Sequence, residues 1–196
     1  MIVTAEDVVR SLRGTVALLN RRPDGLKSFD MTEKGFWHSF GAIWLALPAF
    51  VVVLAFERYR LGLLGPDAPI LDASWVTAVV AAGYVGSFLV LPLGMIGIAR
   101  RLGLGARYVP FVIVTNWALA VGLTILSVPA ALLLIGWATP SLAVLYVLAF
   151  GAIVVRLLWL ATKATLGVSG GLAAAIVVLA VAFDLLIAGT VDSLAG

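Results

Sequence analysis

The chain has 196 residues, of which 63% are hydrophobic and 12% are charged, and its mean hydropathy is +1.15. A soluble domain is about half apolar and about a quarter charged, so these proportions exclude an ordinary soluble fold, which could not cover so much apolar surface. The net charge of +3 comes from basic residues that flank apolar runs, which indicates membrane topology and argues against nucleic-acid binding.

Composition also limits the chemistry that the chain can perform. The absence of cysteine excludes disulfides, thiolate metal sites and a cysteine nucleophile. The single histidine, His38, and scattered carboxylates do not form an ordinary metal site. We therefore expect no cofactor and no metal.

Residues 1–33 are predicted to form a cytoplasmic segment with an amphipathic helix over residues 4–20. Thr4 and Asp7 are spaced as a capping pair, and the Arg21–Gly25 segment, Arg-Arg-Pro-Asp-Gly, ends the helix in a turn. The apolar residues at helical spacing on one face are Val8, Val9, Leu12, Val16 and Leu19. Such a helix either lies on the membrane surface or packs under its own bundle, and both alternatives stay open.

Residues 34–196 are predicted to form a transmembrane domain of five helices, so the expected fold class is an all-α polytopic membrane bundle. The predicted spans are 34–56, 74–99, 108–136, 140–163 and 170–190. A turn at Gly65-Pro66-Asp67 separates the first two, and Thr139 as N-cap with Pro140 at the first helical position separates the third and fourth. A four-helix alternative places the first or last helix at the interface.

Three prolines are expected to bend these spans, namely Pro48, Pro92 and Pro129. The third span would be about 43 Å long, beyond the ~30 Å hydrocarbon core, so it must tilt, kink at Pro129 or project from the membrane.

The distribution of basic residues predicts the orientation. Alternate segments between the spans carry ten Lys and Arg residues against two on the other side. Because cytoplasmic loops carry the excess, the N-terminus is predicted to be cytoplasmic and the C-terminus periplasmic, in a bacterial inner membrane.

Small residues in the second span predict a packing face for another helix. These residues are Ala82, Gly86, Gly94 and Gly97. Small side chains let two helix backbones approach closely, which is the usual basis of association in a membrane.

Three polar residues inside the spans are candidates for a functional site, namely Asp184, Arg156 and Asn116. An intramembrane carboxylate is costly unless it is paired, hydrated or protonated, so Asp184 is either a proton or cation site or a structural hydrogen-bonding group. Arg156 is predicted to snorkel to the inner surface, and pairing with Asp184 would need a helix shift. Asn116 is expected to join two helices by its amide.

Residues 167–171 match the G-x-S-x-G pattern of serine hydrolases and resemble the serine motif of rhomboid proteases. A dyad would need His38, which is more simply explained as a hydrated residue at the membrane boundary, with pH sensing as the alternative. Ser169 is better explained as the N-cap of the last helix.

The segment from Arg22-Pro23-Asp24-Gly25 to Gly35-Phe36-Trp37-His38-Ser39-Phe40, followed by apolar helices, resembles uncharacterised membrane proteins of alphaproteobacteria. The layout is similar to that of the Yip-type membrane-protein family. The resemblance implies no catalytic residues and a role in membrane organisation or trafficking.

The sequence therefore predicts a protein that is not an enzyme and that acts as a structural, accessory or interaction subunit. Its expected partners are the lipid bilayer and either a second copy or a larger membrane complex, with no nucleic acid. The alternative is a small proton- or cation-coupled transporter or channel that uses Asp184 and Asn116.

Overall fold

A computed structural model describes residues 3–62 and 73–195, and every regular element in these ranges is helical. The predicted turn at residues 65–67 lies outside the described residues. The elements are α1 (Ala5–Leu19), η1 (Pro23–Ser28), α2 (Glu33–Ser39), α3 (Ala42–Leu45), α4 (Leu47–Gly62), α5 (Ala73–Arg101), α6 (Gly105–Leu134), α7 (Pro140–Leu166) and α8 (Gly170–Ala195).

Four of the described helices, α5 to α8, are long and apolar enough to cross a membrane. A fifth span exists if α2–α3 and α4 are counted together as one broken helix. The expected all-α, multi-pass membrane bundle with a preceding amphipathic helix is therefore confirmed.

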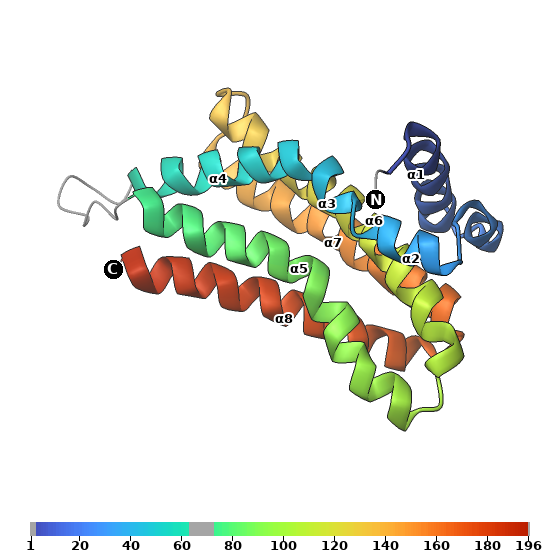
Figure 1. Cartoon of the computed structure of the whole chain (residues 1–196). Helices are drawn as coiled ribbons and strands as arrows, with labels where there is room; N and C mark the ends of the chain where they lie inside the picture. The colour runs from blue at the N-terminus through green and yellow to red at the C-terminus, as the bar shows by residue number, and fades with distance from the viewer. Residues whose placement is uncertain (1–2, 63–72, 196) are drawn as a thin grey trace.

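The long helices α4, α5 and α8 run side by side, and α1 lies across their direction at one end of the bundle (Figure 1). The C-terminus lies at the opposite end, near the end of α4. Helix α6 is the centre of the packing, because it contacts α1, α2, α3, α4, α5 and α7. Its residues from Phe111 to Ala120 are all buried, as expected for a helix surrounded by other helices.

The first predicted span is not one helix. The segment Glu33–Leu45 and the segment Leu47–Gly62 meet at 41°. Pro48 has no backbone N–H and disfavours a helical residue before it, so the helix restarts at Leu47 with Pro48 in its first turn. The break is stabilised from α5, where the hydroxyl of Tyr84 donates to the carbonyl oxygen of Ile43. The sequence predicted a bend at Pro48 but not this interruption.

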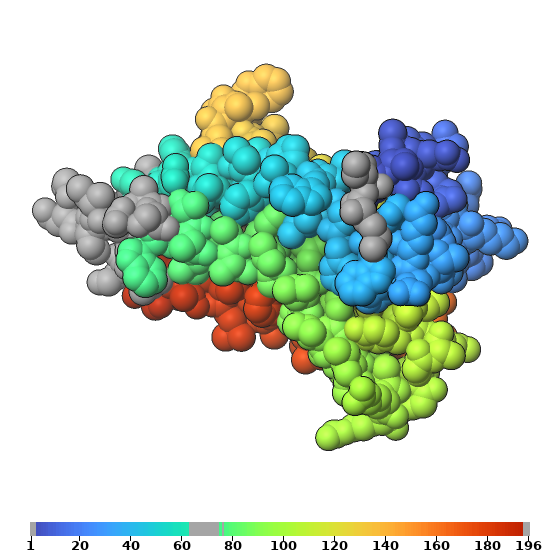
Figure 2. Space-filling model, viewed as in Figure 1, coloured from blue at the N-terminus to red at the C-terminus, as the bar shows by residue number. Residues whose placement is uncertain are grey.

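The third predicted span is a single helix of 30 residues in which Pro129 is accommodated. At about 1.5 Å per residue it is about 45 Å long, so it exceeds one hydrocarbon thickness, as predicted. Its far end and the start of α7 project from the body of the bundle, as the yellow and orange segment at the top of Figure 2 shows. Thr139 caps α7 by accepting from the Leu142 N–H at 3.3 Å, with Pro140 at the first position.

Helix α5 packs along α8 through glycines. A methyl group added at Gly83 would lie 2.6 Å from a side-chain carbon of Ile187, and one added at Gly86 would overlap the ring of Phe183. Of the other predicted packing residues, Gly94 and Gly97 have no neighbour within 4 Å. The four small residues therefore do not share one face: Gly86 serves packing within the chain, and Gly94 and Gly97 point away from it. Ala82 is also exposed.

Helices α7 and α8 are joined by three residues. Gly167 ends α7 with a left-handed backbone (φ +62°), which glycine adopts without a Cβ penalty. Arg107 donates to the carbonyl oxygen of Leu166, one of the groups that a helix end leaves unpaired. Ser169 accepts from the Leu172 N–H at 3.3 Å and caps α8, as predicted.

Candidate functional site

The N-terminal helix is held to the bundle by a face that the sequence did not indicate. The buried residues of α1 are Ser11, Gly14, Thr15 and Leu18. Gly14 approaches Gly25 of η1 so closely that an added methyl group would lie 2.9 Å from the Gly25 carbonyl oxygen. In contrast, Val9 and Val16 on the predicted apolar face remain 47% and 50% exposed. Helix α1 therefore docks mainly through small residues, with Val8 and Leu19 of the predicted apolar face also packed against the core, while Val9 and Val16 stay exposed.

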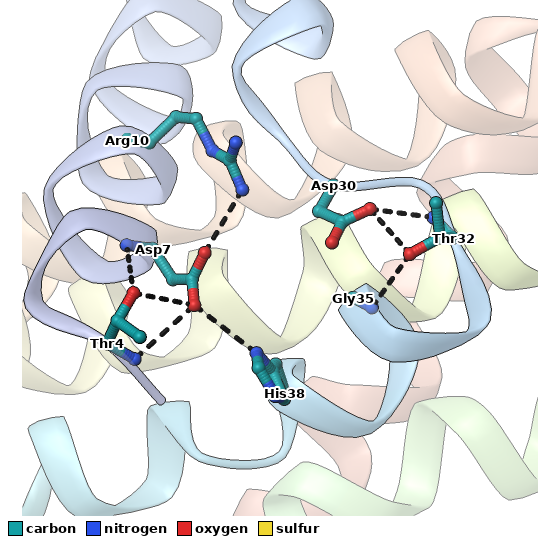
Figure 3. A network of polar contacts seen from close by, with 7 residues as sticks. All are labelled: Thr4, Asp7, Arg10, Asp30, Thr32, Gly35 and His38. Atoms are coloured by element: carbon teal, nitrogen blue, oxygen red, sulfur yellow. Dashed lines mark hydrogen bonds and ion pairs between the residues drawn. The ribbon is translucent and has the colours of Figure 1, made fainter. Parts of the chain in front are cut away.

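A polar network at the start of α1 connects this helix to α2 (Figure 3). Thr4 accepts from the Asp7 N–H at 3.2 Å, and the Asp7 carboxylate accepts from the Thr4 hydroxyl at 2.9 Å and from its N–H at 3.3 Å. This is a reciprocal capping box, with aspartate in the position that glutamate usually occupies. Arg10 adds an ion pair to Asp7 at 3.1 Å.

His38 is part of this network. It is 7% exposed, and its Nδ1 atom lies 3.3 Å from Oδ2 of Asp7, a residue 31 positions earlier in the chain. An ionised carboxylate only accepts hydrogen bonds, so Nδ1 carries the hydrogen in this contact. The interpretation of His38 as a hydrated boundary residue is therefore wrong, because the docking of α1 covers it.

A second cap lies beside the first and starts α2. Asp30 accepts from the Thr32 N–H at 3.0 Å and from its hydroxyl at 2.6 Å, and the Thr32 oxygen accepts from the Gly35 N–H at 3.3 Å. Gly35 is required here because a Cβ atom would lie 2.7 Å from the Asp30 carbonyl carbon. These contacts fix the orientation of the first turn of α2, and His38 on this helix faces α1.

Hydrogen bonds lower the pKa of both carboxyl groups in this region, Asp7 and Asp30. The Thr4 hydroxyl lowers the pKa of Asp7 below its ordinary value, with a smaller contribution from His38, while partial burial opposes the shift. The Thr32 hydroxyl lowers the pKa of Asp30 in the same way. Both groups are therefore anionic at neutral pH and balance the basic residues at this end of the bundle. The space between Asp7, Asp30 and His38 is about 10 Å³, which is room for about one water molecule.

Replacing Asp7 with alanine is expected to lower the free energy of unfolding by about 1 kcal/mol at neutral pH, since it removes the capping box and the His38 contact. A carboxylate with a lowered folded-state pKa stabilises the protein above the unfolded value of 3.8. The contribution of the Asp7 carboxylate to the stability difference between wild type and D7A is therefore fully present at neutral pH and declines as the pH falls below about 4.

Thermal unfolding in detergent across this pH range measures the difference. Asp24→Ala is the matched control, because Asp24 is exposed and pairs only with the exposed Lys27 at 3.4 Å. The expectation fails if D7A and D24A are equally stable at pH 7.

Asn116 lies beneath this network in the core of α6. It is fully buried, and its amide donates to the hydroxyl of Ser39 at 3.0 Å, which in turn donates to the Phe36 carbonyl at 2.7 Å. The amide oxygen of Asn116 has no hydrogen-bond partner among the described residues. Asn116 therefore joins two helices, as its structural interpretation predicted.

Asp184 lies elsewhere, on the outer surface of α8. Its Oδ1 atom is 2.9 Å from the hydroxyl of Ser87 on α5, and that hydroxyl is also 2.9 Å from the Gly83 carbonyl oxygen. Ser87 has one hydrogen to donate and two oxygen neighbours, so its hydroxyl links the Asp184 carboxyl group to the backbone of α5. Within the described residues no ion pair joins Arg156, which is exposed, to Asp184.

The third charged cluster lies at the opposite end of the bundle from α1. Arg60 pairs with Glu57 at 2.7 Å and with Asp192 at 2.6 Å, which joins the end of α4 to the end of α8. Arg58 donates to the Thr77 hydroxyl at 2.9 Å on α5. These contacts join the end of α4 to both α5 and α8.

Apart from the Arg60 cluster, the polar residues form three separate groups. Asp7 and His38 join α1 to α2, Asn116 joins α6 to α2, and Asp184 joins α8 to α5. Sequence separations of 31, 77 and 97 positions explain why no local pattern could predict these pairs.

Comparison with known proteins adds no function. No family model, curated protein or solved structure matches the chain. The resemblance to Yip-type proteins stays a prediction from the sequence.

Proposed function

We propose that this chain is a non-catalytic membrane protein that acts by packing against another membrane-embedded helix, either from a second copy or from a larger complex. The observation that carries this proposal is the start of α7, which projects with α6 beyond the other helices (Figures 1 and 2). Val144, Leu145 and Leu148 are 60–67% exposed there. A helix pair that leaves its own bundle offers a side to a neighbour that the rest of the chain does not cover.

The intramembrane polar residues support the same proposal. Asn116 and Ser39 bond to each other inside the core, and Asp184 bonds to Ser87. Each of these groups stabilises contacts between helices of this chain, which is the usual role of polar side chains in membrane bundles.

We further propose that the end of the bundle with α1 faces the cytoplasm of a bacterial inner membrane. The α5–α6 and α7–α8 turns lie at that same end (Figure 1). Together with residues 1–34 these turns carry ten basic residues, against two, Arg58 and Arg60, in the last turns of α4. The natural chain has no cysteine, so single cysteines introduced at Asp24 and at Ser193 can be tested with a membrane-impermeant maleimide. Labelling of S193C in intact cells, and of D24C only after permeabilisation, is the expected result.

Photo-crosslinking tests the packing proposal. A photoreactive amino acid at Leu145 or Leu148 is expected to crosslink to a protein in native membranes. The same group at Leu157, which is fully buried, is the matched control and should react only within the chain. Capture of lipid alone from both exposed positions would contradict the proposal.

A second function is favoured by the place of Asp184, an acidic residue within a span and in contact with Ser87 of the neighbouring helix. An intramembrane carboxyl group is suited to carry protons or cations. Asn116, the other residue of this alternative, bonds to Ser39 and not to Asp184 or Ser87. Proton flux into liposomes, measured with a pH-sensitive dye, separates the two functions. The transporter interpretation requires flux in the wild type and its loss in Asp184→Asn, whereas the packing interpretation predicts no flux in either.

A further inference from the structure

A groove of about 580 Å³ lies between the turn after α1 and the last turns of α7. Three of the residues that line it are basic, and none is acidic. The lining residues are Leu18, Arg21, Arg22, Pro23, Trp159, Leu160, Lys163 and Ala164. Within the described part of the chain, the three cations Arg21, Arg22 and Lys163 make no ion pair.

The backbone holds the two arginines in place. The Arg22 N–H donates to the Ala17 carbonyl and the Arg21 N–H donates to the Leu18 carbonyl, both at 2.9 Å, which is the hydrogen-bond pattern of a Schellman motif. The left-handed position of this motif usually holds glycine, but here Arg21 occupies it with φ 58°. A side chain at this conformation costs about 1 kcal/mol. The chain thus places a guanidinium where glycine would be more stable.

Trp159 and Lys163, near the end of α7, form the opposite wall of the groove. The indole N–H of Trp159 donates to the Gly170 carbonyl at 2.9 Å, which fixes the ring. The ammonium group of Lys163 lies 5.1 Å from the centre of this ring, in the range of a cation–π contact. Tryptophan and lysine at the end of a span are the residues that anchor a helix at the level of lipid headgroups.

The position of the groove relative to the membrane indicates the kind of ligand that it can bind. Helix α7 is an apolar helix long enough to cross a membrane, and the groove lies at its C-terminal end, at the end of the bundle that α1 crosses (Figure 1). At this depth, unpaired cations above an apolar floor of Leu18, Leu160 and Ala164 match a phosphate headgroup and the first carbons of its acyl chains.

We propose that this groove binds the headgroup of an anionic phospholipid, with its phosphate between the two arginines and Lys163. The proposal does not depend on the protein partner of α7. Because Arg21 takes a strained backbone position, lipid binding and stability should respond in opposite directions to its replacement by glycine.

The test titrates the full-length protein in detergent with dioleoylphosphatidylglycerol and, separately, with dioleoylphosphatidylcholine, and counts bound lipids by native mass spectrometry. Wild type is expected to bind phosphatidylglycerol at least about tenfold more tightly than phosphatidylcholine. The R21Q/R22Q/K163Q variant should lose this preference. The matched control R13Q/K34Q/R101Q has the same change in net charge at exposed positions outside the groove and should keep it.

Arg21→Gly keeps the test informative if the triple variant does not fold. We expect this variant to unfold at a higher temperature than wild type in the absence of phosphatidylglycerol and to bind this lipid more weakly. Equal lipid binding by R21G and wild type would overturn the proposal. Equal losses in the triple variant and the matched control would also overturn it, as would full displacement of phosphatidylglycerol by inorganic phosphate, which would indicate a site for a free anion.

Discussion

Replacing Gly35 with alanine is expected to lower the free energy of unfolding by about 2–3 kcal/mol, the range for overpacking at a site that cannot relax easily. The new methyl carbon would lie 2.7 Å from the carbonyl carbon and 2.9 Å from the Cβ atom of Asp30. These atoms belong to the turn that caps α2, so the turn or the helix must move. Movement of α2 separates His38 from Asp7 and loosens the docking of α1.

Thermal unfolding in detergent, followed by tryptophan fluorescence, measures this loss. The matched control is Gly94→Ala within α5, where no other described segment has an atom within 4 Å of the added methyl group. Because alanine is about 1 kcal/mol better than glycine in a helix, G94A should be as stable as wild type or more so. Equal stability of G35A and G94A would contradict the close contact between Gly35 and the Asp30 backbone.

Replacing Asn116 with aspartate is expected to have a comparable or larger effect, about 3 kcal/mol or more, since it places a carboxylate in a fully buried site without a basic partner. The change also removes the amide donor to Ser39. Unfolding temperature in detergent, together with the yield of monodisperse protein, reports the loss.

Asn116→Leu is the matched comparison at the same position. Leucine has the same branching at Cγ but is larger, so it overpacks the site while it removes the unpaired amide oxygen and leaves the Ser39 hydroxyl bonded to the Phe36 carbonyl. We expect a loss of about 1–2 kcal/mol, smaller than that of N116D. A hydrated path for a solute through this position would reverse the order, because N116D would then be tolerated. Such a result would favour a transport function.

The interruption of the first span shows what a sequence can and cannot predict in this protein. Pro48 lacks a backbone donor, which is a local property, so a bend there was predictable. Whether the chain bends or stops depends on which group satisfies the freed carbonyls, and here Tyr84 of another helix donates to Ile43. That donor is 41 positions away, and its contact is a property of the packed bundle.

The N-terminal helix also has local features that the sequence predicts and tertiary contacts that it does not predict. Its helical spacing, the Thr4–Asp7 cap and the arginine pair at its end are all local and were read correctly from the sequence. The hydrophobic pattern indicated one apolar face made of Val8, Val9, Leu12, Val16 and Leu19. Val8 and Leu19 pack against the core, but Val9 and Val16 are exposed, and the fully buried residues include Ser11, Gly14 and Thr15. In a membrane protein the apolar side of a helix can face lipid, so hydrophobicity alone does not indicate the side that contacts protein.

The sequence by itself determined the membrane class, the helix caps at Thr139 and Ser169, and the positions of most helix ends, because these depend on hydropathy and on hydrogen bonds within a few residues. The tertiary structure alone decided the partners of His38, Asn116 and Asp184 and brought the Arg21–Arg22 turn against Lys163. These contacts join residues 31 to 142 positions apart, and only the packing of the helices around α6 sets their separation in space.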